Sequence, residues 1–220
     1  MHIPDGFLTP EICVLMYAIS IAILIFCWRR IKAVYSRSFV PLIAVSSAFV
    51  FAAQMLNFPI VYGTSGHLVG GTFLAILLGP FAAIISMTTV LLMQAIIFAD
   101  GGLFTFGANI FNMAIIGGLS FYIIKLLGDG GVSRKRFLVS VFVASWLSVV
   151  LGALACALQI GVSPMFASAG GVFVTVPSML FWHVLIGAGE AVITTTLISQ
   201  LYRIQPAVFS GIAVLKGEMQ

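Results

Sequence analysis

The chain has 220 residues, of which 61% are hydrophobic and only 7% are charged, with a mean hydropathy of +1.20. A soluble globular domain carries about 25% charged residues, so this chain has too few charges to coat a folded surface in water. The composition excludes a soluble enzyme, a nucleic-acid-binding domain and a disordered regulator. It predicts an all-α integral membrane protein, because apolar runs of helical length are present and the alternation of a membrane barrel is absent.

The first segment of the chain is not a signal peptide, because it lacks a positively charged start and contains the turn-forming Pro4-Asp5-Gly6. Thr9, Pro10 and Glu11 then predict a helix start: a capping hydroxyl, a proline suited to the first helical position, and an acid that complements the helix dipole. We expect residues 1–11 to lie outside the membrane.

Seven apolar segments follow as candidate membrane helices. A single helix over 67–98 would be about 48 Å long, too long for a hydrocarbon core of about 30 Å, and Gly79-Pro80 can break it. The expected spans are therefore 12–28, 39–57, 68–79, 81–98, 103–127, 137–160 and 178–202.

The ten cations test this count. They are Arg29, Arg30, Lys32 and Arg37 after the first span, Lys125, Arg134, Lys135 and Arg136 around the end of the fifth, and Arg203 and Lys216 near the end of the chain. Because Lys and Arg favour the cytoplasmic side, an even number of spans must separate the first two groups. The prediction is a seven-transmembrane-helix bundle with its N-terminus outside and its C-terminus cytoplasmic. We expect one membrane domain over 1–220: an outer segment 1–11, the bundle 12–202 and a cytoplasmic tail 203–220.

Several sequence motifs are absent. There is no GxxxxGK[ST] motif for binding ATP, no HExxH or GxSxG motif, and no pairing of nucleophile and base. We therefore expect no enzymatic activity and no ATP bound by this chain. Cys13, Cys27 and Cys156 lie in apolar runs without a metal-binding spacing, which favours core positions.

Nitrogen groups offer the clearest chemistry. The amine of Met1, the backbone nitrogen of His2 and the His2 imidazole can chelate one cation in adjacent five- and six-membered rings. These donors lie in one plane and leave one corner of a square, which His67 can fill from the same side of the membrane. Square-planar nitrogen sites favour Ni(II) and Cu(II), and only a strongly polarising cation displaces the amide proton. The residues alone leave open a plain terminal histidine and a loop histidine bonded to backbone.

The opening Met1-His2-Ile3-Pro4-Asp5-Gly6-Phe7-Leu8 resembles that of the substrate-binding membrane subunit, or S component, of cobalt/nickel energy-coupling-factor (ECF) transporters. The segment 63–68, Gly-Thr-Ser-Gly-His-Leu, and the segment 107–113, Gly-Ala-Asn-Ile-Phe-Asn-Met, are also similar to that family. The resemblance covers nearly the whole chain. It implies a seven-helix bundle with an unblocked N-terminus that holds the metal through Met1, His2 and His67. We expect Met1 to be retained, because His at position 2 is too large for the usual removal of the initiator methionine.

The resemblance also implies a role and partners. The chain would be the capture subunit of an importer for Ni(II) or Co(II) in a bacterial or archaeal cytoplasmic membrane, tilting to release the ion inside. A transmembrane coupling subunit and a pair of ATPase subunits would drive it, with a small accessory membrane subunit as a further option and no nucleic acid. The choice between nickel and cobalt stays open.

Other polar and small residues have two interpretations. Asn109 and Asn112 share a helix face and either support His67 as second-shell groups or form interhelical hydrogen bonds, and the same choice applies to Gln54, Asn57 and Gln94. Stripes of small residues either pack within the bundle or, as the resemblance implies, dock the coupling subunit; they are Ala18, Ala22, Ala44, Ala48 and Ala52.

One alternative function remains. His183 and Glu190 lie seven residues apart on one face of the last span, and a carboxylate within a membrane is a functional candidate. These two residues predict a secondary transporter or channel that carries a cation between them.

Overall fold

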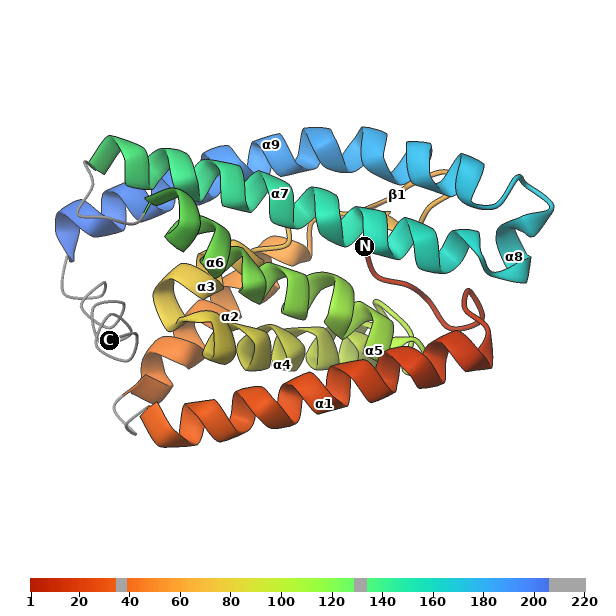
Figure 1. Cartoon of the computed structure of the whole chain (residues 1–220), viewed down its shortest axis with the longest axis horizontal. Coiled ribbons are helices and arrows are strands. Elements are labelled where there is room, and N and C mark those ends of the chain that lie inside the picture. Colours follow the sequence, from red (N-terminus) through yellow and green to blue (C-terminus); the bar gives the residue numbers. More distant parts are fainter. Residues whose placement is uncertain (35–38, 129–133, 206–220) are drawn as a thin grey trace.

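The computed structural model describes residues 1–34, 39–128 and 134–205. Apolar runs form helices that lie side by side along one long axis (Figure 1). The elements are α1 (Pro10–Val34), α2 (Val40–Gln54), β1 (Phe58–Pro59), β2 (Ser65–Gly66), α3 (Gly71–Leu78), α4 (Pro80–Phe98), α5 (Phe106–Asn109), the π-helical η2 (Ile110–Ile115), α6 (Ile116–Gly128), α7 (Arg134–Gly161), α8 (Pro164–Ala167) and α9 (Val172–Ile204).

Each of the seven expected spans contains helix, but the helices differ in length. Within the described residues, five helical stretches are long and apolar enough to cross a membrane: α1, α4, the continuous α5–η2–α6, α7 and α9. Helix α2 has 15 residues, and α3 has only eight, which reach about 12 Å. The helix expected over 68–79 is therefore confined to 71–78, and the structure does not confirm seven complete crossings.

The break between α3 and α4 lies where the sequence predicts it. Helix α3 ends at Leu78, Gly79 adopts φ 75° and ψ 164°, and Pro80 opens α4. The positive φ suits glycine, and proline lacks the N–H that a continuing helix would need. A tight corner replaces one over-long helix.

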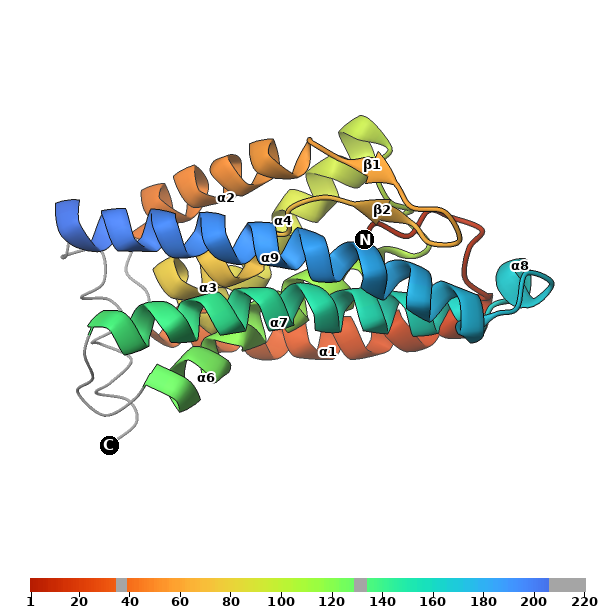
Figure 2. The ribbon, with the colours of Figure 1, turned by 90° about the horizontal axis from the view of Figure 1, so that it is seen from above.

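The bundle places α7 and α9 together on one side and α1 on the opposite side, with α3, α4 and α6 between them (Figure 1). The antiparallel pair β1–β2, in which Phe58 faces Gly66, lies beside α9 (Figure 2). Residues 1–9, called the arm below, fold back so that the N-terminus lies in the middle of the molecule (Figure 1). Within the expected outer segment 1–11, residues 1–3 and Leu8 are buried, whereas residues 4–6 are exposed.

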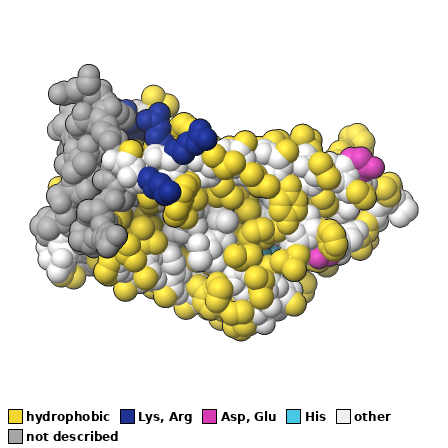
Figure 3. Space-filling model, turned by 90° about the horizontal axis from the view of Figure 1, so that it is seen from below, with side chains coloured by type: hydrophobic (Ala, Val, Ile, Leu, Met, Phe, Trp, Pro, Cys, Tyr) yellow, Lys and Arg dark blue, Asp and Glu magenta, His cyan; other side chains and the backbone are white. Residues whose placement is uncertain are grey.

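Charges separate along the long axis. On the face shown in Figure 3, Lys and Arg side chains gather toward one end and Asp and Glu side chains toward the other. The cations and the acids of this face therefore lie toward opposite ends of the helices. Arg37, Lys216 and the tail after Gln205 lie outside the described residues.

Candidate metal centre

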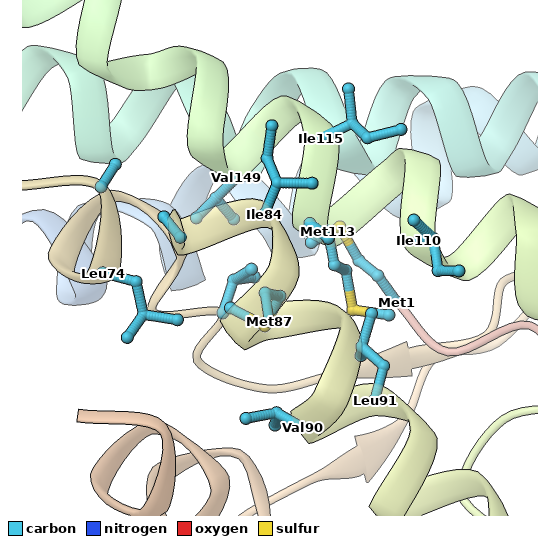
Figure 4. Packing of buried hydrophobic residues seen from close by; sticks show 14 of the residues in the cluster. Met1, Leu74, Ile84, Met87, Val90, Leu91, Ile110, Met113, Ile115 and Val149 are labelled. Atoms are coloured by element: carbon cyan, nitrogen blue, oxygen red, sulfur yellow. The ribbon is translucent and has the colours of Figure 1, made fainter. Parts of the chain in front are cut away.

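The first three residues of the arm are core residues. Met1 and Ile3 are fully buried and His2 is 3% exposed. Figure 4 shows the Met1 side chain beside Met113 and Leu91, among hydrophobic residues of α4 and η2. Burial of a methionine side chain contributes about 1.5–3 kcal/mol, so this side chain anchors the terminal amine inside the bundle.

Asn109 binds the arm at Ile3 through two hydrogen bonds. The Ile3 N–H donates to Asn109 Oδ1 at 2.8 Å, and Asn109 Nδ2 donates to the Ile3 carbonyl at 3.1 Å. That carbonyl also accepts from the Gly102 N–H at 2.9 Å and the Thr105 hydroxyl at 2.5 Å. Asn109 therefore supports the site, but through Ile3, where the sequence suggested His67 or its loop.

Asp5 fixes the arm a second time. Its carboxylate accepts from the N–H groups of Leu103, Phe104 and Thr105 at 3.0, 2.8 and 3.2 Å. These are the free donors just before α5, where the helix dipole also favours an acid. A β-carbon on Gly102 would lie 1.9 Å from Asp5 Oδ1, so the chain can pass this close only at a glycine.

Ser65, at the start of β2, receives the two terminal nitrogens. The Met1 amine donates to the Ser65 carbonyl at 2.5 Å and to Ser65 Oγ at 2.9 Å. The His2 N–H donates to the same Oγ at 3.1 Å. One residue thus aligns two of the four nitrogens that the sequence singles out.

His67 follows β2 and is held by the segment before α3. Its Nδ1 donates to the Leu68 carbonyl at 2.7 Å, which leaves the Nε2 lone pair free. The next two N–H groups, of Val69 and Gly70, donate to the two oxygens of Glu190 at 2.6 and 2.8 Å. Gln54 donates to the Val69 carbonyl at 2.5 Å, so polar side chains satisfy this extended backbone inside the bundle.

Three of the four nitrogens present lone pairs, and the fourth, the His2 backbone N–H, donates to Ser65 Oγ. The Met1 amine lies 3.0 Å from His67 Nε2, and adjacent ligands on one square-planar ion with bonds of about 2.0 Å lie about 2.8 Å apart. His2 Nε2 lies 3.1 Å from Gln94 Oε1 and so carries its hydrogen there. His2 Nδ1 then presents a lone pair, and it has no hydrogen-bond partner among the described residues although it is buried. The rings of His2 and His67 stack with centroids 4.6 Å apart.

Burial keeps these donors neutral. It lowers the pKa of the Met1 amine from 8.0 to about 5. Burial, followed by the nearby amine charge, lowers the pKa of His2 to about 3, and the same two causes lower the pKa of His67 well below its ordinary value. At neutral pH the amine has two hydrogens, which match the two Ser65 oxygens, and a lone pair. Metal binding requires this unprotonated state.

Asn112 and the small-residue stripes, which the sequence also singled out, lie away from the four nitrogens. Asn112 forms a reciprocal amide pair with Gln159 at 2.8 and 3.0 Å, so it is an interhelical bond and has no contact with His67. The two stripes of small residues face outward and do not pack within the bundle; Ala18, Ala22, Ala44, Ala48 and Ala52 are all exposed.

His183 and Glu190, the two residues of the alternative cation site, have other partners at three of their four polar side-chain atoms, and the fourth, His183 Nε2, is buried without a hydrogen-bond partner among the described residues. Both Glu190 oxygens are engaged by backbone N–H groups, and His183 Nδ1 donates to the Met179 carbonyl at 2.8 Å. The structure therefore gives Glu190 a bracing role for the segment that carries His67.

Sequence reasoning missed Ser65 and Asp5 as contacts of the arm. Asp5 had one usable signal, because it is an acid in a turn close to a helix start. Ser65 had none, because its role depends on where distant loops meet. Among the described residues, no three His, Cys, Asp or Glu side chains are grouped so that they could hold a metal ion by themselves, and two of the four candidate donors are backbone nitrogens.

The family described as "Cobalt uptake substrate-specific transmembrane region" matches residues 2–208. The chain belongs to this family. A fused nickel transport protein NikMN of Rhodobacter capsulatus is 36% identical over 218 residues, 94% of this chain and 63% of that protein. A relative from Archaeoglobus fulgidus, provisionally named as the same kind of fused protein, is 39% identical over 94% of this chain and 68% of its own length. The chain thus spans about two thirds of the length of these fused relatives.

A solved structure supports the fold. A crystal structure described as a truncated transition metal transporter aligns with a TM-score of 0.85 at 35% identity, over 92% of this chain and 99% of that one. The relatives are named as transport proteins and not as enzymes. The chain is therefore a multi-pass membrane protein of a metal transport family.

Proposed function

We propose that this chain captures Ni(II) or Co(II) from outside the cell through four nitrogens: the Met1 amine, the His2 backbone nitrogen, His2 Nδ1 and His67 Nε2. It serves as the substrate-specific membrane subunit of an ATP-driven importer. Met1 is the free first residue of the mature protein in this proposal.

One observation carries the proposal. The Met1 amine and His67 Nε2 face each other at 3.0 Å, while the buried His2 Nδ1 lacks a partner. The lone pairs of the Met1 amine and His67 Nε2 face each other, and His2 Nδ1 has no hydrogen-bond partner among the described residues. Such an arrangement is unfavourable in a metal-free protein and favourable around a cation. The names of the family and the relatives, cobalt uptake and nickel transport, supply the metals.

The chemistry favours a small, strongly polarising ion. Binding through the His2 nitrogen releases the amide proton that now points to Ser65 Oγ. The resulting negative charge offsets one of the two positive charges of the ion, which lowers the cost of holding it in an apolar bundle. The square arrangement leans toward nickel, and low-spin Co(II) can adopt the same plane.

The topology follows from the charges. The whole chain, 1–220, forms one membrane domain with seven crossings over 12–202, the short α3 completing its crossing with the extended segment before it. The end that carries Lys and Arg faces the cytoplasm together with the tail 203–220, and the metal centre opens outward in a bacterial or archaeal cytoplasmic membrane.

The proposed partners come from the resemblance to the transporter family. A pair of ATPase subunits would act through a transmembrane coupling subunit, with an accessory membrane subunit as an option, and the lack of an ATP-binding motif in this sequence is consistent with that division. The outward-facing alanines of α1 and α2 are the docking candidates. The fused relatives carry additional sequence beyond the part that this chain matches.

Blocking the amine tests the site. Adding Gly-Gly before Met1 should weaken nickel binding by more than about a hundredfold, the upper end of what losing an outer-shell partner costs. Two residues are used because a single one would build a new four-nitrogen chelate with His2. A Gly-Gly added after Gln220 is the matched control, and titration calorimetry on detergent-purified protein gives the affinity.

The two buried histidines make a second pair of variants. H67A should lose nickel affinity and the absorption bands of square-planar nickel. H183A should keep the bands, because His183 lies beside the centre at the Ser65 backbone but supplies none of the four nitrogens. Tight binding by the N-terminally extended protein and by H67A would refute the site, and loss of binding in H183A alone would favour transport through His183 and Glu190.

A further inference from the structure

Asp100 contacts the centre without belonging to the four nitrogens. It lies in the turn after α4, and its Oδ1 is 3.4 Å from His2 Nδ1. Its other oxygen accepts from Asn57 Nδ2 at 2.8 Å, which fixes the carboxylate in place. A lone pair on nitrogen and a carboxylate oxygen repel at this distance, and a cation bound at Nδ1 turns that repulsion into attraction.

The other acids near the arm and the His67 segment are committed elsewhere. Asp5 accepts three backbone N–H groups before α5, and Glu190 accepts two before α3. A divalent ion bound through one deprotonated amide carries a remaining charge of +1. An uncompensated buried charge is costly, so a carboxylate beside the ion has a large effect.

Asp100 also lies between the centre and water. Its side chain is 18% exposed, whereas that of His2 is 2% exposed. The turn closes over the His2 ring: a β-carbon on Gly101, which has φ +90°, would lie 3.3 Å from His2 Cδ2. Figure 3 shows a small area of histidine surface on the half of the molecule that bears the acidic side chains.

We propose that Asp100 is the entrance carboxylate of the metal centre: it attracts the hydrated divalent cation at the rim and then remains beside the ion on His2 Nδ1, where it neutralises the remaining charge. This inference rests on the proposed function and adds a residue that sets the capture rate and the affinity.

The test uses full-length protein with nickel as the probe. D100N removes the charge and keeps the shape, and D100E restores the charge. E11Q is the matched control, because Glu11 is an exposed acid in the first turn of α1 and its loss changes the net charge equally. Stopped-flow association at low and high salt, equilibrium affinity and the nickel absorption spectrum are measured for each variant.

We expect D100N to associate at least about tenfold more slowly at low salt, to lose most of the salt dependence, and to bind more weakly while keeping the square-planar spectrum. D100E should recover most of the rate, and E11Q should match the wild type. Wild-type kinetics in D100N, or equal effects in D100N and E11Q, would overturn the inference.

Two outcomes separate this inference from the function on which it rests. If D100N destroyed the square-planar spectrum in a folded protein, Asp100 would be an obligatory ligand and the entrance role would be wrong. If H67A bound nickel as the wild type does, the four-nitrogen centre would fail and the role of Asp100 would fail with it. Normal kinetics in D100N beside a defective H67A reject Asp100 alone.

Discussion

The arm and the segment that carries His67 meet at one point but are held there by different means. The arm is held by its own backbone at Ile3 and by the Asp5 carboxylate, both bonded to the 102–109 region. The His67 segment is held by side chains of long helices, Glu190 from α9 and Gln54 from α2. The His67 segment is thus tied to side chains of two long helices, whereas most hydrogen bonds of the arm go to the loop and helix start at 102–109 and to Ser65.

This difference suggests how a buried centre admits an ion. His2 and His67 are only 3% and 2% exposed, so part of the site must move during capture. In the proposed centre the arm supplies three of the four nitrogens, and its opening would break contacts to Gln94, Asn109 and Ser65 without breaking the backbone of a helix. We expect the arm to open and close over a rigid His67, with Ser65 as the contact that re-forms on closure.

Lowering the pH should have the largest effect on nickel affinity, and it should act through the nitrogens of the arm. In the proposed centre each bound ion would displace the His2 amide proton, so nickel affinity should fall about tenfold per pH unit from pH 8 to 5. Below about pH 5 the fall should steepen, because the Met1 amine then takes up a proton even in the closed arm. Titrations against a competing chelator at each pH measure this slope, and a flat profile would contradict amide ligation.

The same amine couples pH to closure of the metal-free arm. Its pKa is 8.0 when free and about 5 when buried, so the closed state favours the neutral form. Closure is thus fully favourable above pH 8 and weakens as the pH falls to 5. Hydrogen exchange should show residues 2 and 3 losing protection over this range while the helices keep theirs. Equal loss in both regions would contradict a separately moving arm.

Removing the Glu190 carboxylate should have the next largest effect, and it should lower the stability of the fold as well as nickel affinity. E190A leaves the N–H groups of Val69 and Gly70 without acceptors, at a cost of about 1–3 kcal/mol each. We expect a lower melting temperature of the metal-free protein, together with weaker nickel binding as His67 shifts. E190Q keeps one amide oxygen and should recover part of both losses. Normal stability with lost binding would instead make Glu190 a ligand.

Much of this architecture is predictable from local physics. Hydropathy locates the apolar helices, and Gly79-Pro80 marks the corner between α3 and α4, because these signals act within a few residues. The length of α3 is not predictable in this way. Residues 68–70 are apolar enough for helix, but Glu190 and Gln54, distant in the sequence, provide their backbone with other partners.

The proposed ligands were accessible from the sequence, and most of their supports were not. The chelating geometry of Met1 and His2 is a local property of the chain start, and His67 required only the correct side of the membrane. Asn109 was singled out, but its partner could not be known without the path of the arm. Asp100 comes near His2 only because the turn after α4 folds over the arm.

Removing the Asp5 contacts of the arm should have the smallest effect on nickel affinity, and it should leave the stability of the helices nearly unchanged. D5A leaves the N–H groups of residues 103–105 without their carboxylate, but these lie near the surface where water can replace it. Loss of such a cap costs about 1–2 kcal/mol, so nickel affinity should fall about tenfold. The melting temperature should shift by no more than about 4–8 °C, because the helices are not involved.

The controls for D5A separate anchoring from charge. D5N keeps the oxygen acceptor and should retain more affinity than D5A, whereas E11A removes an exposed acid and should bind as the wild type does. Hydrogen exchange in D5A should rise at Ile3 and stay unchanged at Val69, because only the arm loses an attachment. If Val69 lost protection to the same extent, the arm and the His67 segment would be a single cooperative unit, and capture would require both to open.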